Sequence, residues 1–301
     1  MRVAISSLWF PVTISRYFLA ALERREDLEV VSIGPYPGTF IPWNNGMELL
    51  GKYAVPPTIP LARHLWNIRS MSSKFLNDYK ELQDIDVWIE ADSNFYFRER
   101  PPCRTKVHIA IDPHVLDYSE QRGTSDYFFN MQKFYSQPGD IYLPYCASRY
   151  HHYAEEVEKE YDVCLVGLQY PNRNELVAAL RREGISAHYE LGLGPDEYRT
   201  AYSKSRVAIS WSSMQDLIAR VFEAGAFGLP LVCNRVPDLP LHFTEGEHYL
   251  GFDTLSEAVA QVKKVLADMN SYKDMATSFH NEVMSKHTYD NRIEQIMETI
   301  K

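Results

Sequence analysis

The sequence of 301 residues contains no run of about 18 consecutive apolar residues, the length that a membrane-spanning helix requires. Its first residues, Met1 to Ser6, already follow a strand-like pattern, and the apolar core of a signal peptide is missing. We therefore expect a cytoplasmic protein without a membrane span.

Cysteine is scarce, and no two cysteines form the C-x-x-C pair of a zinc site. Free cysteine is among the most buried residue types, so we expect reduced core residues at Cys103, Cys146, Cys164 and Cys233. The adjacent pair His151–His152 has no acidic partner at a metal-ligating spacing. We expect two surface histidines there and no metal site.

Positive charge is also in short supply, because 31 Lys and Arg stand against 40 Asp and Glu, for a formal net charge of −9. Nonspecific DNA binding needs clustered cations, so this balance argues against a DNA-coating surface, although it is compatible with a local basic groove. Internal repeats and low-complexity tracts are absent. What is left is an ordinary globular protein whose length predicts two packed domains.

Short apolar strands alternate with amphipathic helices along the chain, in two series that are typical of parallel α/β sheets. We predict two Rossmann-like, doubly wound domains over residues 1–150 and 151–286, and a C-terminal helix in 287–301 that can pack back on the first domain. Between residues 35 and 60, six prolines and three glycines predict a long irregular loop.

The segment 215–234 combines a polar helix start with an apolar strand. If residues 216–226 are helical, Arg220 and Glu223 share one face near the positive end of the helix, which suits a charged ligand such as a sugar nucleotide. The simpler alternative is an exposed Asp216–Arg220 ion pair, worth about 0.3–0.5 kcal/mol, with glycines that only pack and end the helix.

Asp112 and His114 follow a predicted strand, at the carboxyl edge where α/β folds place their ligand chemistry. Either side chain can act as a general base toward a hydroxyl group, so this pair is the catalytic candidate. The alternative is that Asp112 caps a turn and His114 packs or binds the sugar. Glu90 is a weaker candidate base, and Trp9 and Trp43, beside predicted loops, are candidates for contacting the acceptor.

Three motifs occur in an order that is shared with one enzyme family. They are Arg220-x-x-Glu223-Ala-x-Ala-x-Gly228-x-Pro230, then Glu245-Gly-Glu-His248, and finally His287-Thr-Tyr-x-x-Arg292. Asp112-Pro-His114 fits the same order. On these residues the sequence resembles group 1 glycosyltransferases and, more narrowly, their CgeB-like (spore-maturation-protein-like) branch, over most of residues 86–301.

The resemblance implies the GT-B fold, in which two Rossmann-like domains face each other across a cleft and the C-terminal domain holds a nucleotide sugar. Arg220 and helix N-terminal amides, with Ser212 and Ser213 just before them, would contact the donor phosphates. Gly167 ends a strand and can let a phosphate approach the backbone, with Arg173 close behind. Equally, Gly167 can permit a tight turn and Arg173 can begin a helix.

Glu223 corresponds to the family's glutamate that accepts hydrogen bonds from ribose hydroxyls. Many retaining relatives carry a second glutamate eight positions earlier, where this chain has Gln215. An amide can hydrogen-bond a sugar hydroxyl but cannot act as an anion or a base. The resemblance therefore leaves retaining and inverting chemistry open.

We expect a metal-independent enzyme without a cofactor, which moves a sugar from a nucleoside-diphosphate sugar to a hydroxyl of a small molecule, glycan, protein or modified DNA base. Arg220 and backbone amides would replace a divalent metal at the leaving diphosphate. Two alternatives are an enzyme that glycosylates a hydroxymethylated base in DNA and a non-catalytic sugar-nucleotide-binding protein. Gln215 is the only feature that favours the second.

Overall fold

The computed structural model describes residues 1–7, 13–33, 70–71, 82–91, 96–97, 99–191 and 193–301. The chain divides into two compact units, the first made of Met1–Pro144 with Tyr289–Lys301 and the second of Tyr145–Thr288. Three features of the sequence analysis lie outside the described residues: Trp9, Trp43 and the proline-rich loop.

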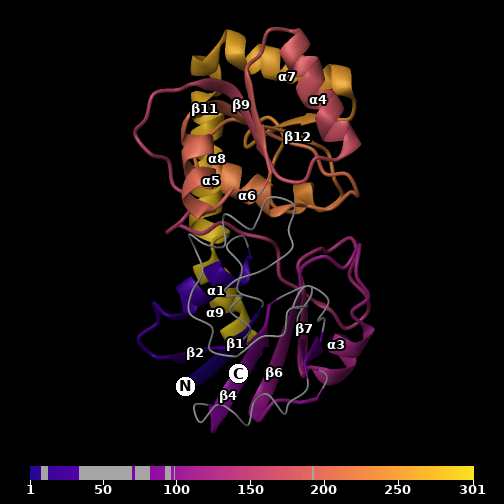
Figure 1. Ribbon diagram of the computed structural model, residues 1–301, viewed down its shortest axis with the longest axis vertical. Helices are drawn as coiled ribbons and strands as arrows, with labels where there is room; N and C mark the ends of the chain where they lie inside the picture. The colour runs from indigo at the N-terminus through magenta and orange to yellow at the C-terminus, as the bar shows by residue number, and fades with distance from the viewer. Residues whose placement is uncertain (8–12, 34–69, 72–81, 92–95, 98, 192) are drawn as a thin grey trace. The chain divides into compact units, whose positions relative to one another are not determined.

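A six-stranded parallel sheet with the order β2-β1-β4-β6-β7-β8 forms the centre of the first unit (Figure 1). Its strands β1 and β4 are almost entirely buried, which explains their continuous rather than alternating apolar runs. The strands are β1 (Arg2–Ser6), β2 (Glu29–Ile33), β4 (Ile85–Glu90), β6 (Cys103–Ala110), β7 (Tyr127–Asn130) and β8 (Ile141–Tyr142). The first unit also contains a separate strand pair, β3 (Ser70–Met71) and β5 (Tyr96–Phe97), and the short helix α3 (Ser119–Thr124).

The last helix of the chain, α9 (Tyr289–Thr299), belongs to the first unit and packs against α1 (Ser15–Leu22). The rings of Phe18 and Tyr289 meet edge to face at 4.9 Å. Arg292, from the last of the three motifs, donates from Nε to the carbonyl of Pro144 at 2.6 Å. In this structure Arg292 therefore holds the returning helix in place.

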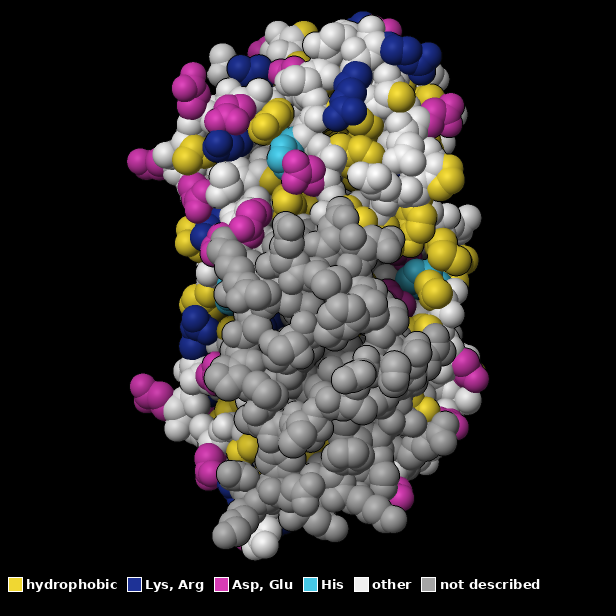
Figure 2. Space-filling view, in the orientation of Figure 1, with side chains coloured by type: hydrophobic (Ala, Val, Ile, Leu, Met, Phe, Trp, Pro, Cys, Tyr) yellow, Lys and Arg dark blue, Asp and Glu magenta, His cyan; other side chains and the backbone are white. Residues whose placement is uncertain are grey.

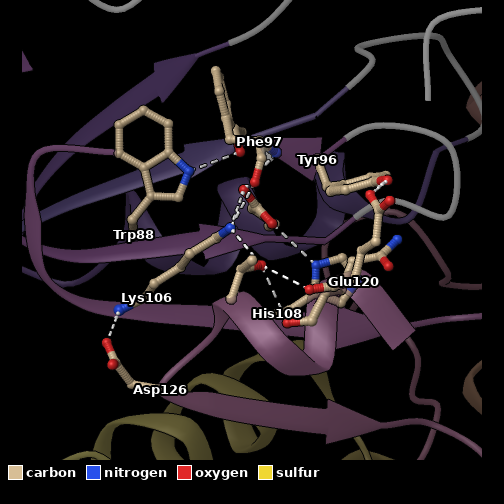
Figure 3. A network of polar contacts seen from close by, with 11 residues as sticks. Trp88, Tyr96, Phe97, Lys106, His108, Glu120 and Asp126 are labelled. Carbon is tan, nitrogen blue, oxygen red and sulfur yellow. Dashed lines mark hydrogen bonds and ion pairs between the residues drawn. The ribbon is translucent and has the colours of Figure 1, made fainter. Parts of the chain in front are cut away.

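A buried ion cluster joins β4 to β6 in the first unit (Figure 3). The carboxylate of Glu90 lies 3.3 Å from Lys106 Nζ and 3.2 Å from His108 Nδ1, and it accepts the N–H of Phe97 at 2.9 Å. All three charged or titratable side chains are fully buried, and burial lowers the pKa of His108. Glu90, the weaker candidate base of the sequence analysis, is therefore an interior structural residue.

The second unit has a five-stranded parallel sheet with the order β10-β9-β11-β12-β13. Its strands are β9 (Tyr161–Val166), β10 (Ala187–Glu190), β11 (Ser205–Ser210), β12 (Leu231–Asn234) and β13 (Leu250–Phe252). Its helices are α4 (Pro171–Arg182), α5 (Pro195–Ser203), α6 (Ala219–Ala226), α7 (Leu255–Ala267) and α8 (Lys273–Lys286), with short 3-10 turns η4 (Leu239–Leu241) and η5 (Met269–Tyr272). Alternate apolar residues of the strands form one core with α4 and α7.

The strand order of the second unit reverses between β9 and β11. The chain runs from β9 to the edge strand β10, then returns past β9 to continue through β11, β12 and β13. In doubly wound sheets, ligands bind outside the carboxyl ends of the strands at such a reversal. The loops after β9 and β11 are therefore the first place to look for a binding site.

None of the helices in the described part of the chain is long and apolar enough to cross a membrane. The four cysteines are free, and Cys146, Cys164 and Cys233 are buried as predicted. Cys103 is partly exposed, so the prediction of a core position was wrong for this residue.

Candidate functional site

Two helices of the second unit begin at the strand reversal, and both begin without a capping side chain. Helix α4 follows β9 and carries Arg173 in its first turn, while α6 follows β11 and carries Arg220 in its first turn. Neither first turn contains an acidic residue. At the start of α4, the N–H of Arg173 donates to Asn172 Oδ1 at 3.0 Å. The helix dipole makes both ends electropositive, and each arginine adds a full charge. This combination destabilises the empty site and favours a bound anion.

The Arg220 guanidinium lies against the backbone of Gly167, the residue that follows β9. A Cβ built on Gly167 would be only 2.7 Å from Arg220 Cζ, so the absence of a side chain is what admits the arginine. Gly167 has φ +137°, and its N–H donates to the carbonyl of Glu190 at 2.9 Å. Arg220 is half-buried and forms no hydrogen bond or ion pair with any residue that the structure describes.

Arg173 is a buried cation beneath the same loops. Its Nε donates to the carbonyl of Trp211 at 2.8 Å and its Nη1 to that of Leu168 at 2.9 Å, which ties the loop after β11 to the loop after β9. Burial and, secondarily, the positive charge of Arg220 lower the pKa of Arg173 to about 10. The two arginines therefore repel each other, and an anion near both would relieve that repulsion.

The loop 211–218 is held by its own hydrogen bonds rather than by a helix. The Ser212 hydroxyl donates to the Asp216 carboxylate and accepts the Asp216 N–H at 3.1 Å. Ser213 donates to Asn172 Oδ1 at 3.0 Å, a second link between the two loops. Gln215, which lies between Ser213 and Asp216 in this loop, is exposed and adopts φ +59°, an uncommon backbone conformation for a residue with a side chain.

The prediction of a helix from Asp216 was wrong by three residues, because α6 starts at Ala219. Asp216 precedes the helix, so Asp216 and Arg220 do not lie on one helix face. The alternative of an exposed ion pair between them on the helix is therefore wrong. The glycines of the helix do have the packing roles that were considered. A Cβ on Gly225 would meet Val283 Cγ2 at 2.6 Å, and Gly228, at φ +66°, ends the helix.

Glu223 lies one turn after Arg220 on α6, and each of its carboxylate oxygens faces a different side chain. The Tyr198 hydroxyl donates to Oε2, and His152 Nε2 lies 3.8 Å from Oε1. Burial raises the pKa of Glu223 and lowers the pKa of His152 to about 3. His152 is only 2% exposed, so the prediction that it is a surface residue was wrong. Its neighbour His151 is half-buried.

Residues 149–298 match the sequence model of a family described as glycosyl transferase-like. The match covers both loops at the strand reversal, the two arginines and Glu223. The chain is a glycosyltransferase. No curated protein sequence matches this glycosyltransferase.

Solved structures share the fold of the glycosyltransferase over its whole length. HepE of Anabaena, solved in complex with UDP-glucose, has a TM-score of 0.64 and 10% identity, covering 100% of this chain and 99% of that one. Sucrose-phosphate synthase of Thermosynechococcus elongatus has a TM-score of 0.58 and 11% identity, covering 100% and 98%. A glycosyltransferase of Rickettsia africae has a TM-score of 0.56 and 8% identity, covering 99% and 97%. This likeness shows the fold, two Rossmann-like domains of the GT-B type.

In the first unit of the glycosyltransferase, Asp112 and His114 follow β6 and are partly exposed at the carboxyl edge of the sheet. The N–H of Asp112 donates to the hydroxyl of the buried Tyr118 at 3.4 Å. The His114 ring lies 5.4 Å from that of Tyr135, whose neighbour Phe134 is 53% exposed. The pair therefore sits beside an aromatic surface that the sequence analysis did not identify.

The sequence analysis of the glycosyltransferase also missed Tyr198, the hydroxyl donor to Glu223. Tyr198 lies on α5 and Glu223 on α6, and the two are 25 residues apart in the sequence. No local spacing joins them, so only the packing of α5 beside α6 reveals the contact. The sequence analysis considered His152 only as one half of a histidine pair, and its position beside Glu223 was not predicted.

Proposed function

We propose that this glycosyltransferase binds a nucleoside-diphosphate sugar, with UDP as the nucleotide, and transfers the sugar to an acceptor hydroxyl without a metal ion. The observation that carries the proposal is the convergence of Arg173, Arg220 and two helix N-termini at the strand reversal. A diphosphate supplies the concentrated negative charge that this arrangement favours. HepE has been solved with UDP-glucose, with UDP and glucose, and with UDP, which supports the choice of nucleotide.

In this mechanism the bond between the sugar C1 and the diphosphate oxygen breaks, and the bond between C1 and the acceptor oxygen forms. The diphosphate leaves with its electron pair, and Arg220 and the amides at the start of α6 stabilise the charge that develops on it. Arg173 is engaged with two backbone carbonyls, so it contributes its charge and holds both loops.

The other predicted donor-site residues have supporting places in this mechanism. Gly167 provides the space for Arg220, and Ser212, Ser213 and Gln215 form the loop in front of α6. Glu223 accepts hydrogen bonds from the ribose.

Metal independence gives the first prediction. If the arginines and helix amides carry the leaving diphosphate, transfer with UDP-glucose as the donor should proceed at the same rate with and without excess EDTA. The measurement is the initial rate of UDP release in both conditions, with circular dichroism to confirm that the chelator leaves the fold intact. Loss of turnover in EDTA that added Mg²⁺ or Mn²⁺ restores would contradict this part of the proposal.

The donor proposal is tested by a thermal-shift screen of nucleoside diphosphates and their sugars. A ligand that binds only the folded protein stabilises it by about 2.7 kcal/mol at a concentration of about 100 times its Kd. We expect UDP and UDP-sugars to raise the melting temperature, whereas uridine, which lacks the diphosphate, should leave it unchanged. An equal shift with uridine would show that the arginines are not the binding determinant.

The acceptor side of the proposal rests on the first unit. Asp112 or His114 would take the proton of the acceptor hydroxyl, and the surface of Phe134 and Tyr135 beside His114 suits the apolar face of a sugar ring. A glycan acceptor fits this surface. Membership of the CgeB-like branch remains a proposal that depends on the three sequence motifs.

Modified DNA as the acceptor would require a basic groove beside Asp112. Its described neighbours Asp117 and Glu120 are instead exposed and acidic, and Arg122 is paired with Asp140 at 2.7 Å. On the face shown in Figure 2, Lys and Arg side chains are interspersed with Asp and Glu among the described residues. These observations do not favour a DNA-modifying enzyme.

A further inference from the structure

The carboxylate of Glu223 accepts a hydrogen bond on one oxygen and meets a packed imidazole ring near the other, and both partners come from other parts of the second unit. Tyr198, on α5, donates its hydroxyl proton to Oε2. His152, in the segment before β9, places Nε2 3.8 Å from Oε1. The Nε2–Oε1 separation is beyond hydrogen-bond distance, so the Tyr198 hydroxyl orients the carboxylate while the buried His152 ring restricts its rotation by packing.

The proton positions in this group can be derived from the contacts. Burial, and then the negative charge of Glu223, raise the pKa of Tyr198 well above its ordinary value, so the tyrosine keeps its proton and is the donor. The N–H of Ser148 donates to His152 Nδ1 at 3.0 Å, so that nitrogen carries no proton. In the neutral imidazole the proton is therefore on Nε2, the nitrogen that faces Glu223.

Both partners are themselves fixed by packing. The Tyr198 ring lies 4.7 Å from the ring of Tyr202 and 6.1 Å from that of Phe227, and His152 lies 6.0 Å from the same phenylalanine. Loss of the Tyr198 hydroxyl alone would leave these ring contacts in place. The Tyr198 hydroxyl can therefore be removed by mutation without loss of the ring packing that holds both side chains.

We propose that Tyr198 and His152 are positioning residues of the donor site, which fix the Glu223 carboxylate so that it accepts hydrogen bonds from the ribose of a nucleoside diphosphate. The proposal rests on the proposed function, because it assumes that Glu223 meets the ribose. It adds two residues that do not touch the donor and that determine how strongly the protein distinguishes ribose from deoxyribose. Burial of a polar cluster for stability alone would give no such discrimination.

The test compares the binding of UDP, 2′-deoxy-UDP and 3′-deoxy-UDP by isothermal titration calorimetry in the full-length protein and its variants. In the wild type, loss of the hydroxyl that contacts Glu223 should weaken binding by tenfold or more, roughly the effect of a hydrogen bond to a charged group. In Tyr198→Phe this discrimination should fall at least about threefold, because the unsupported carboxylate is no longer held in one orientation.

Three further variants separate positioning from general damage. His152→Met should reduce the discrimination, whereas His152→Gln, which can keep an N–H donor near the position of Nε2, should largely restore it. Tyr249→Phe removes another buried tyrosine hydroxyl of the second unit and should leave the discrimination unchanged. Melting curves of each variant confirm that it is folded.

The outcomes distinguish the two levels of the proposal. If the wild type binds UDP and discriminates, but Tyr198→Phe and His152→Met discriminate equally well, the positioning role is wrong and the donor site stands. If the wild type binds UDP with no preference for ribose, the role of Glu223 is wrong. If the wild type does not bind UDP at all, the proposed donor is wrong, and the positioning proposal is overturned with it.

Discussion

Replacement of Arg220 by alanine should lower kcat/KM for a UDP-sugar by roughly 100- to 1,000-fold. This is the loss expected when one preorganised group that stabilises the negative charge developing in the transition state is removed. Arg220 is half-buried, close to Arg173, and bound to no described residue, so no structural partner competes with a diphosphate for it. The measurement is the rate of sugar transfer or of donor hydrolysis across a range of donor concentrations.

The same substitution should not destabilise the protein. A cation in the first turn of a helix opposes the helix dipole, and alanine has the higher helix propensity, so the free energy of unfolding should rise by about 0.5 kcal/mol. Lost activity with equal or greater stability is the signature of a residue retained for ligand binding. A residue that only supports the fold would lose both together.

Arg235→Ala is the matched control for Arg220→Ala. Arg235 is another arginine of the second unit, but it pairs with Glu245 at 2.6 Å and with Asp253 at 2.6 Å on the surface. Its removal should leave kcat/KM unchanged and alter stability by no more than about 1 kcal/mol. Arg220→Lys should recover part of the activity, because it restores the charge without the two-pronged guanidinium. Wild-type kinetics in Arg220→Ala would refute the assignment.

The sequence was sufficient to predict the α/β architecture, because short apolar strands such as β9 and β11 alternate with amphipathic helices in the second unit. The edge strand β13 was not predicted, since its three residues, Leu250–Phe252, are too few to show a pattern. The start of α6 was misplaced for a local reason. Asp216 looks like the first residue of a helix, but the Ser212 hydroxyl bonds to it and holds an irregular turn until Ile218.

The candidate donor site was predictable in its residues but not in its arrangement. Gly167, Arg173 and Arg220 were each selected from their own local sequence. That Arg220 fills the space beside Gly167 depends on the adjacency of β9 and β11, which are separated by a helix, a strand and a second helix in the chain. The support of Glu223 by Tyr198 and His152 is likewise a tertiary contact without a sequence signal.

The adjacency of Gly167 and Arg220 leads to the second large effect, in Gly167→Ala. A methyl group on Gly167 would occupy the position of the Arg220 guanidinium, and the flexible arginine would move away rather than the backbone. Displacement of the charge should reduce kcat/KM by roughly 100-fold, close to the loss expected for Arg220→Ala. The φ of +137° adds backbone strain of about 1–3 kcal/mol, so stability should also fall.

Gly184→Ala separates the strain from the displacement. Gly184 also has a positive φ, +77°, and belongs to the second unit, but a Cβ there would have no atom within 4 Å. It should lower the melting temperature through the backbone penalty and leave kcat/KM unchanged. If Gly184→Ala and Gly167→Ala lost activity equally, the loss would come from reduced stability rather than from the position of Arg220.

The double variant Gly167→Ala/Arg220→Ala decides whether the two residues act as one unit. Once the arginine side chain is absent, the methyl group has nothing to displace, so the double variant should be no less active than Arg220→Ala alone. Multiplied losses would mean that Gly167 contributes independently, for example by letting a phosphate approach its backbone. A non-additive result would show that the glycine serves the donor site by making room for the arginine, since its own N–H is already engaged by Glu190.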